Sequence, residues 1–499
     1  MTAQTERLAS LLTGLLLTIL PLAAQSQEFR LLHAFSGADG NQPTSVVRVD
    51  GSIYGVTALG GDAGVGNGVL YKVDNAGAFQ IVHVFTDQPD GSIPGRLMRA
   101  ADGTIYGLTG SGGNPPFGTV YKIDAAGNYS IVHSFNGTTE GASPVSLIQE
   151  KDGSFLGTTA DGGVLPGGCH GHLPNGTLFR MDASGNVTPL HTFCEDVDGS
   201  IPNSVVEGAD GMLYGTCFED GPLKPGVLGG GTMWKSDLSG NVVLLHVFWT
   251  GLVTDANPAE PLGIIQAPNG FFYGVANQGG AFNDRGAIFR ADTQGNIRTI
   301  HSFSDLAADG ADPEANFVLA ADGFFYGTAS TGGLPIDSPT RSGVIYRADM
   351  RGNVWVLHSY DGDDGLQPSA TPELGAQGAI LYATAIRQGP LLDGTVARLD
   401  LRRAIPVTSL TFSPNPVVEG RATTATVTLT NPAPAGGQLL QIVTQSTVQV
   451  PSTVFVRAGE TTAQFPVRTH VGQAPETASI TAAKGSLGVS SPLAIVRTN

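Results

Sequence analysis

The stretch Ile131-Val132-His133-Ser134-Phe135 decides the fold, because its pattern returns seven times along the chain. Each copy has an apolar pair, a histidine, a small or apolar residue, and then Phe or Tyr. The other copies are Leu31 to Phe35, Ile81 to Phe85, a shortened one at Leu190 to Phe193, Leu245 to Phe248, Ile300 to Phe303 and Leu357 to Tyr360. Their histidines are His33, His83, His133, His191, His246, His301 and His358, with successive separations of 50, 50, 58, 55, 55 and 57 residues. A period of this length predicts a repeat architecture.

Four short strand-like runs fill each period. In one unit they begin at Ser146, Ser154, Gly176 and Val187, and apolar residues alternate within each run. The turn Asp152-Gly153 joins the first two runs, and Asp-Gly or Asn-Gly between such runs is a strong hairpin signal. Four antiparallel strands repeated around a centre are the blades of a β-propeller. An open solenoid is the structural alternative.

The two ends of the repeat region are offset from each other. The first motif, Phe29 to Phe35, is a fourth strand with no first three strands before it, whereas the last unit ends after its third strand, residues 394–400. We therefore expect the N-terminal strand to complete the blade of residues 369–400, which would remove an exposed strand edge. The predicted fold of residues 27–403 is all-β, a seven-bladed β-propeller closed by the N-terminal strand.

The region before the repeats predicts export. Arg7, an apolar run from Leu11 to Leu22 and the small residues Ala23 and Ala24 have the layout of a signal peptide, assigned to residues 1–26. No later stretch is apolar enough to predict a membrane span in the mature chain. The net charge of −17 argues against nucleic-acid partners, because phosphates require clustered Lys and Arg. A secreted protein, extracellular or periplasmic, with a glycan or protein ligand is expected.

The strings Tyr106-Gly107-Leu108-Thr109, Gly112-Gly113 and Gly118 to Lys122, which recur with the histidine motif, resemble the GloVer-type tandem repeat of exported bacterial proteins. The resemblance covers about residues 29–400 and implies export and a repeat architecture, but no catalytic residues. Some units depart from it, at Leu156 for Tyr, at Asp220 for the first Gly of the pair, and at Ala383 and Gln388 for glycines. These departures are expected to weaken individual blades.

Residues 404–499 lose the period and are rich in Thr, Val, Pro and Ala. Runs such as 426–429 and 454–457 alternate as the strands of a sandwich do. This part resembles the Ig-like modules of bacterial surface proteins, and it contains no Cys. A second domain, an Ig-like β-sandwich, is predicted there.

The repeated histidines suggest a structural role. Side chains two apart on a strand share a face, so His83 would lie between Ile81 and Phe85. Such a histidine is expected to bond a Ser, Thr or backbone group between blades. A ring of catalytic ligands is the alternative.

An acid follows each histidine, in the connection after the fourth strand. These acids are Asp39, Asp90, Glu140, Asp198, Asp255, Asp309 and Asp364, and Asp196 adds to the fourth loop. One interpretation is a turn acid that caps backbone N–H groups. The other is ligand or Ca²⁺ binding on this face, although the loops supply only part of the six to eight oxygens that Ca²⁺ prefers. No other cofactor is predicted.

The three cysteines allow one disulfide, for which Cys169 and Cys194 are the preferred pair, with Cys217 left as a buried thiol. The cluster Cys169-His170-Gly171-His172 has no second set of metal ligands, so any metal remains unknown.

Loop lengths concentrate the variation on one face. Between the Gly-Gly position and the glycine that opens strand three, the units hold 6, 4, 12, 9, 5, 9 and 4 residues. Insertions gathered on one face usually mark the binding surface of a repeat protein. With no nucleophile motif, the sequence favours a non-catalytic binding or surface-interaction protein, with its ligand on this face. The alternatives are a polysaccharide-acting propeller enzyme, a glycosidase or lyase using acids such as Asp196, Asp198, Asp361 and Asp364, and a structural spacer.

Overall fold

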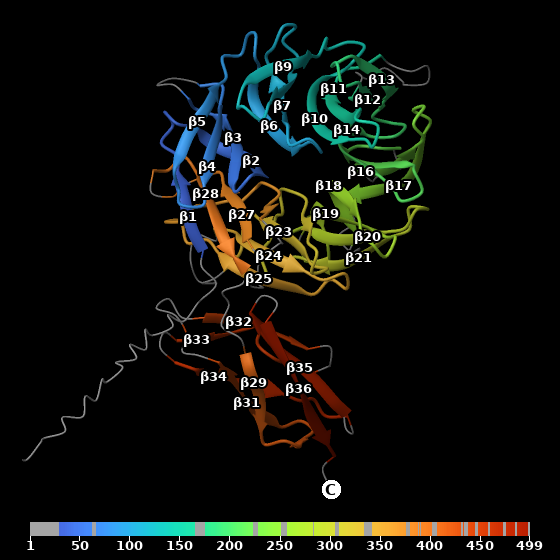
Figure 1. The fold of residues 1–499 in the computed structure, drawn as a ribbon. Helices are drawn as coiled ribbons and strands as arrows, with labels where there is room; N and C mark the ends of the chain where they lie inside the picture. The colour runs from blue at the N-terminus through green and yellow to red at the C-terminus, as the bar shows by residue number, and fades with distance from the viewer. Residues whose placement is uncertain are drawn as a thin grey trace, which may run out of the picture.

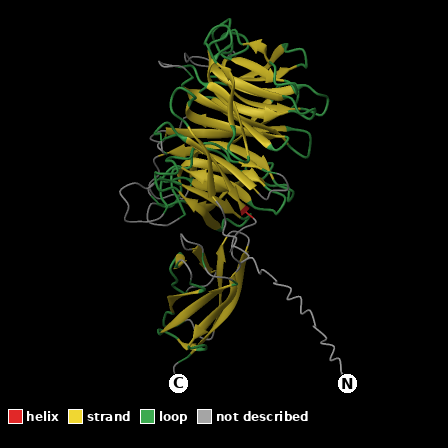
Figure 2. Ribbon diagram, turned by 60° about the vertical axis from the view of Figure 1, so that its left-hand side comes forward, coloured by secondary structure: helices red, strands yellow, loops and turns green. Residues whose placement is uncertain are grey.

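The structure, a computed structural model, describes residues 29–497 (Figures 1 and 2). Its gaps are residues 62–65, 165–174, 223–227, 251–256, 283, 305–308, 334–341, 376–379, 388, 390, 402–406, 431–432, 434–437, 445–447, 458–459, 473–475 and 485–486. The predicted signal peptide and the predicted domain boundary at 403/404 lie outside the described residues. Figure 2 shows that the described chain consists almost wholly of strands and loops.

Seven four-stranded antiparallel sheets follow one another around a common centre (Figure 1), so the fold is propeller-like. The first three sheets are β2 (Asn41–Val49), β3 (Ser52–Leu59), β4 (Val69–Asp74) and β5 (Phe79–Val84); β6 (Ser92–Arg99), β7 (Ile105–Ser111), β8 (Thr119–Ile123) and β9 (Tyr129–Ser134); and β10 (Ala142–Gln149), β11 (Phe155–Asp161), β12 (Thr177–Met181) and β13 (Val187–Thr192). The next three are β14 (Ser200–Glu207), β15 (Leu213–Glu219), β16 (Leu228–Ser236) and β17 (Val242–Thr250); β18 (Pro258–Gln266), β19 (Phe272–Gly279), β20 (Ala287–Ala291) and β21 (Ile297–Ser302); and β22 (Val318–Leu319), β23 (Phe325–Ala329), β24 (Val344–Ala348) and β25 (Val354–Ser359).

The seventh sheet joins the two ends of the repeat region. It contains β26 (Glu373–Leu374), β27 (Ile380–Ala385), β28 (Thr395–Asp400) and, as its outer strand, β1 (Phe29–Ala34). β1 runs antiparallel to β28, and Phe29 pairs with Leu399. This is the pairing that the offset of the motifs predicts.

The Tyr-Gly string of the repeat is explained by packing between strands two and three. Gly107 pairs with Tyr121, and a Cβ at Gly107 would lie 2.2 Å from the tyrosine ring. Glycine therefore makes room for the aromatic side chain of the next strand. In the seventh sheet, Ala383 pairs with Ala397, so the departure from glycine is matched by a small residue opposite it. That this departure weakens the sheet stays a prediction.

The histidine motif contains a β-bulge, which the strict alternation of side chains did not anticipate. In β5, His83 pairs with Leu70 and Ile81 with Tyr71, so the pairing skips the residue between them. A bulge changes the phase of alternation, and Ile81 is 36% exposed whereas Phe85 is 2% exposed. The prediction that these two residues flank the histidine on one buried face was wrong. The same irregularity precedes the histidine in every sheet.

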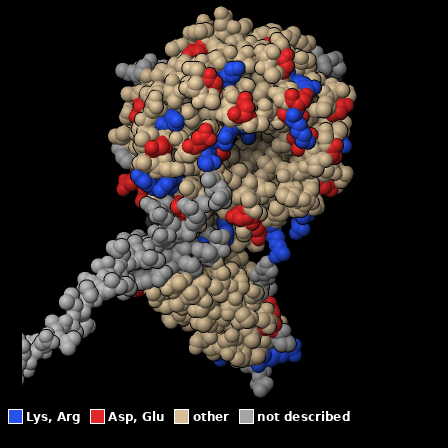
Figure 3. Space-filling view, viewed as in Figure 1, with Lys and Arg blue, Asp and Glu red and all other residues tan. Residues whose placement is uncertain are grey.

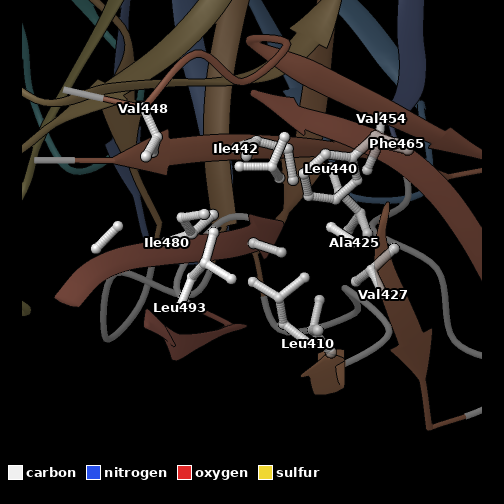
Figure 4. Packing of buried hydrophobic residues seen from close by; sticks show 14 of the residues in the cluster. Leu410, Ala425, Val427, Leu440, Ile442, Val448, Val454, Phe465, Ile480 and Leu493 are labelled. Atoms are coloured by element: carbon white, nitrogen blue, oxygen red, sulfur yellow. The ribbon is translucent and has the colours of Figure 1, made fainter. Parts of the chain in front are cut away.

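The C-terminal part forms two further sheets around one apolar core (Figure 4). One contains β29 (Val407–Ser413), β31 (Ala422–Leu429) and β34 (Thr462–Arg468). The other contains β30 (Val417–Val418), β36 (Leu487–Val496), β35 (Glu476–Lys484), β32 (Gln438–Thr444) and β33 (Thr453–Val456). Side chains from both sheets, including Val427, Phe465, Leu440 and Ile480, fill the space between them. Two sheets that share one core form a sandwich.

The sandwich lies against the outer edge of the sixth sheet (Figure 1). Nζ of Lys484 in β35 donates to the backbone oxygen of Leu357 in β25 at 3.4 Å. Trp355 and Val356 of β25 are 8% and 5% exposed, whereas Val243 at the position of Trp355 in the fourth sheet is 50% exposed. This outer strand is therefore covered, unlike its counterpart in the fourth sheet.

Candidate functional site

The repeated histidines and the repeated acids form one set of contacts. Nε2 of the histidine lies within hydrogen-bond distance of a carboxylate oxygen of the acid that follows it. The described residues show this pair in six of the seven sheets. The distances are 2.9 Å for His33–Asp39, 2.6 Å for His83–Asp90, 3.1 Å for His133–Glu140, 2.6 Å for His191–Asp198, 2.8 Å for His301–Asp309 and 2.6 Å for His358–Asp364. The expectation that the histidines bond Ser, Thr or backbone groups was wrong for Nε2 of these six, because its partner is a carboxylate.

In four of the six loops, the second carboxylate oxygen accepts a hydrogen bond from a backbone N–H of its own loop; the acids are Asp39, Asp90, Asp198 and Asp364. Oδ1 of Asp90 accepts hydrogen bonds from the backbone N–H of Thr86 at 3.0 Å and from its hydroxyl at 2.6 Å. Burial raises the pKa of Asp90, but the hydrogen bonds from Thr86 and His83 outweigh it, so the pKa lies below its ordinary value. The aspartate is thus an ionised cap, as one of the two sequence interpretations describes.

Aromatic rings cover three of these histidines from the neighbouring sheet. Phe79 stacks on His33 with ring centroids 3.7 Å apart, and Tyr129 stacks on His83 at 3.8 Å. Phe29 of β1 stacks on His358 of the sixth sheet at 3.7 Å. β1 is therefore held by a histidine–aromatic stack on each side.

Several predicted residues lie outside the described part of the chain. They include Asp255, the acid that follows His246, and the cluster of Cys169, His170 and His172. Cys194 is disulfide-bonded and Cys217 is a buried free thiol, while the pairing with Cys169 stays a prediction. Within the described residues, no three His, Cys, Asp or Glu side chains gather as a metal site would require. Ligand binding by the repeated acids also stays a prediction, although their carboxylates are engaged as described.

The chain enters each inner strand through the same backbone conformation. The residue before the strand's proline has a positive φ in every sheet: Gln42 (57°), Ile93 (54°), Ser143 (55°), Ile201 (55°), Glu260 (55°), Asp312 (53°) and Gln367 (55°). This left-handed region is costly for residues other than glycine. Because the backbone repeats so closely, differences at the centre of the ring come from side chains.

Side chains that differ between the repeats line a cavity of about 370 Å³ at the centre of the ring. Its walls come from the inner strands and adjoining residues of sheets one, two, five, six and seven, and its polar residues include Thr44, Ser45, Arg96, Asn316, Thr371 and Glu373. Figure 3 shows the surface of the ring, over which acidic and basic side chains are interspersed.

Arg96 breaks the repeat at this cavity. The residue two positions after the inner-strand proline is small in six sheets and large in one: Ser45, Arg96, Ser146, Ser204, Gly263, Ala315 and Ala370. Arg96 is solvent-exposed, yet burial among the surrounding groups lowers the pKa of its guanidinium. The exposure and the lowered pKa are both expected for a side chain that contacts water within a cavity. Its very high intrinsic pKa keeps it charged.

The cavity also contains one acid, which has other partners. Oε1 of Glu373 accepts a hydrogen bond from the backbone N–H of Arg48 at 3.2 Å. Burial raises the pKa of Glu373, and the positive charges that lower it in part are those of Arg48 and Arg99. Arg96 is not among the charges that shift the pKa of Glu373. Among the described residues it has no hydrogen-bond or ion-pair partner.

Sequence reasoning missed Arg96 because it searched for residues that recur. The signal was present in the sequence, because Arg96 is the one large residue at a position that is Ser, Gly or Ala in the other six repeats. Glu373 carried no such signal, because its inner strand, β26, has only two residues and departs from the pattern of the others.

The family model of the Gloeobacter/Verrucomicrobia repeat matches the chain twice, over residues 16–228 and 223–455. A comparison with curated proteins gave no match. No helix in the described residues has the length and apolar character that a membrane crossing requires.

Several solved structures are similar to the chain at low identity. The extracellular domain of a one-component system from B. thetaiotaomicron is 10% identical with a TM-score of 0.49, and the match covers 96% of this chain and 59% of that chain. A gluconolactonase from Xanthomonas campestris is 13% identical with a TM-score of 0.38, covering 76% and 91%. A polysaccharide lyase is 10% identical with a TM-score of 0.43, covering 75% and 93%. At these values the likeness carries no argument about activity.

Proposed function

Because the chain belongs to the Gloeobacter/Verrucomicrobia repeat family, we propose that it is an exported binding protein built on a repeat scaffold. Residues 1–26 are the signal peptide, residues 27–403 a seven-bladed β-propeller closed by β1, and residues 404–499 an Ig-like sandwich. The mature protein works outside the cytoplasm, extracellular or periplasmic. It binds a glycan or a protein and performs no reaction on it.

The proposal is supported by one observation: the polar groups of the repeated loops bond to each other, whereas those of the central cavity differ from repeat to repeat. The repeated carboxylates are engaged by histidines and loop N–H groups, so they stabilise the scaffold. The central cavity, in contrast, contains polar side chains that do not follow the repeat. A pocket of a few hundred Å³ with a small number of convergent polar groups is the usual form of a ligand site. The insertions at 164–175, 222–230 and 334–342, most of whose residues lie outside the described part of the chain, are proposed as further ligand contacts on the variable face.

A second candidate is an enzyme that acts on a polysaccharide. It is favoured by Glu373, because a carboxyl with a raised pKa in a cavity is suited to general acid catalysis. Incubation of the protein and of Glu373→Gln with glycans, followed by measurement of new reducing ends and of unsaturated products, separates this candidate from simple binding. Turnover that disappears in Glu373→Gln would establish the enzyme.

A glycan array with the mature protein tests the binding function, run with and without EDTA. We expect a restricted set of bound glycans, and retention of binding in EDTA, because Glu373 is the one acid among the residues that line the cavity. Loss of binding in EDTA would instead support Ca²⁺ at the repeated acids. Silence on the array would move the proposal to a protein partner or to a structural spacer.

A further inference from the structure

The central cavity contains a positive charge that the described protein does not neutralise. Arg96 lines it, and its guanidinium has five N–H donors. The positive charges that act on Glu373, the acid in the cavity, are those of Arg48 and Arg99. A charged group kept in a partly enclosed site without a partner is costly, and a ligand anion would offset that cost.

The other donors of the cavity add to this charge. Oδ1 of Asn316 accepts from the backbone N–H of Phe317 at 3.0 Å, which leaves its Nδ2 group without a hydrogen-bond partner in the described residues. Gly263 provides the space for this amide, because a Cβ there would lie 3.1 Å from Nδ2. The hydroxyls of Ser369 and Thr371 also line the cavity and make no hydrogen bond within the described residues. The set combines one cation with several neutral donors.

We propose that the cavity binds a sugar that carries a single carboxylate or sulfate, with the anionic group on Arg96. The guanidinium fork matches either anion through two parallel hydrogen bonds. The amide of Asn316 and the hydroxyls of Ser369 and Thr371 bind the hydroxyl groups of the same sugar. The inference rests on the proposed binding function and names the ligand class of that site.

Size and charge set limits on the ligand. The volume of about 370 Å³ suits one or two sugar rings. The net charge of −17 repels a polyanion at long range, so a heavily charged polymer is a poor ligand. An acidic monosaccharide, or one acidic residue at the end of a glycan, satisfies both limits.

The test is calorimetric titration of the mature protein with glucuronate, glucose 6-sulfate and glucose. The variant Arg96→Ser introduces the residue that three other sheets have at this position, Ser45, Ser146 and Ser204, so the backbone accepts it. Arg351→Ser is the matched control, because it removes the same charge from an exposed turn in the sixth sheet. Arg96→Lys keeps the charge without the fork.

We expect an acidic sugar to bind more tightly than glucose, and Arg96→Ser to weaken that binding by about 10- to 100-fold, as for the loss of a charged hydrogen bond. Arg351→Ser should leave it unchanged, and Arg96→Lys should be intermediate. Equal affinity of the wild type and Arg96→Ser for the acidic sugar overturns the inference, as does a wild type that binds neither anion. In either case the array decides the binding function separately, because a neutral glycan bound equally by both proteins would preserve it.

Discussion

The histidine–acid pair is the unit that stabilises each loop at the outer strand. The sequence shows both rings of residues, and each acid follows its histidine by six to nine positions. The pairing was missed because strict alternation was assumed, whereas a bulge before the histidine changes its direction. Arg96 was missed for the opposite reason, since it is the exception among seven copies.

The aspartate of the second sheet's loop offers a direct test of the pair. Asp90→Asn should lower the free energy of unfolding by about 2 kcal/mol, because it removes a charged acceptor from a part-buried pair in which Asp90 is 7% exposed. Thermal unfolding followed by circular dichroism measures the effect. The control is Asp50→Asn, whose side chain is 89% exposed and which should unfold as the wild type does. Equal loss in both variants would contradict a specific role for the pair.

Acid should weaken the fold in two steps. Burial lowers the pKa of His33 below its ordinary value of 6.5, although Asp39 raises it in part, and the pKa of Asp90 lies below 3.8. In both cases the unfolded chain binds more protons than the folded chain, so stability falls as pH drops below each ordinary value. Urea midpoints at pH 7.5, 5.5 and 3.5 measure the two steps. His33→Gln should flatten the first step and Asp90→Asn the second; unchanged profiles would refute the assignment.

At the level of the strand, the order of motifs predicted the partner of β1 correctly, because the last unit lacks the fourth strand that the N-terminal motif supplies. The sequence could not show how β1 is fastened at both sides, through Phe29 on His358 and His33 on Phe79. Those contacts join residues more than three hundred positions apart in one case, and no local pattern reports them.

Removal of β1 tests its role. A variant that begins at Gly37 should melt markedly below one that begins at Gln27, because it loses the pairing with β28 and both aromatic stacks. The newly exposed edge of β28 should also promote self-association, visible by light scattering. Identical melting of the two proteins would sink the proposal that β1 closes the ring.

At the level of the whole molecule, the sandwich and the sixth sheet meet at Lys484. The composition change after residue 403 predicted a second domain, a β-sandwich, but it gave no indication of where that sandwich lies. Of the covered residues of β25, Val356 occupies a position that is apolar in most copies, whereas Trp355 occupies one that is polar in five of the other six. Trp355 was therefore the one available signal that this outer strand is covered.

Burial lowers the pKa of Lys484 to about 8. Between pH 8 and its unfolded value of 10.5, the unfolded chain binds more protons, so stability should rise with pH across this window. Lys484→Met should abolish that rise and stabilise the protein at pH 7, by no more than about 3 kcal/mol. Melting temperatures at pH 7 and 9.5 measure both effects. Lys151→Gln, at a side chain that is 89% exposed, is the control, and a rise that persists in Lys484→Met would contradict the contact.

The pairing of β1 with β28 also fixes a sequence of events during synthesis. β1 leaves the ribosome first, but its partner is complete only after residue 400 has been added. The loop that must close between them spans nearly the whole repeat region, so this contact forms last and slowly. Until then, β1 has no partner strand and the edge of β28 in the seventh sheet is unpaired. A chain with this arrangement can remain unfolded at its two ends while it is moved from one compartment to another.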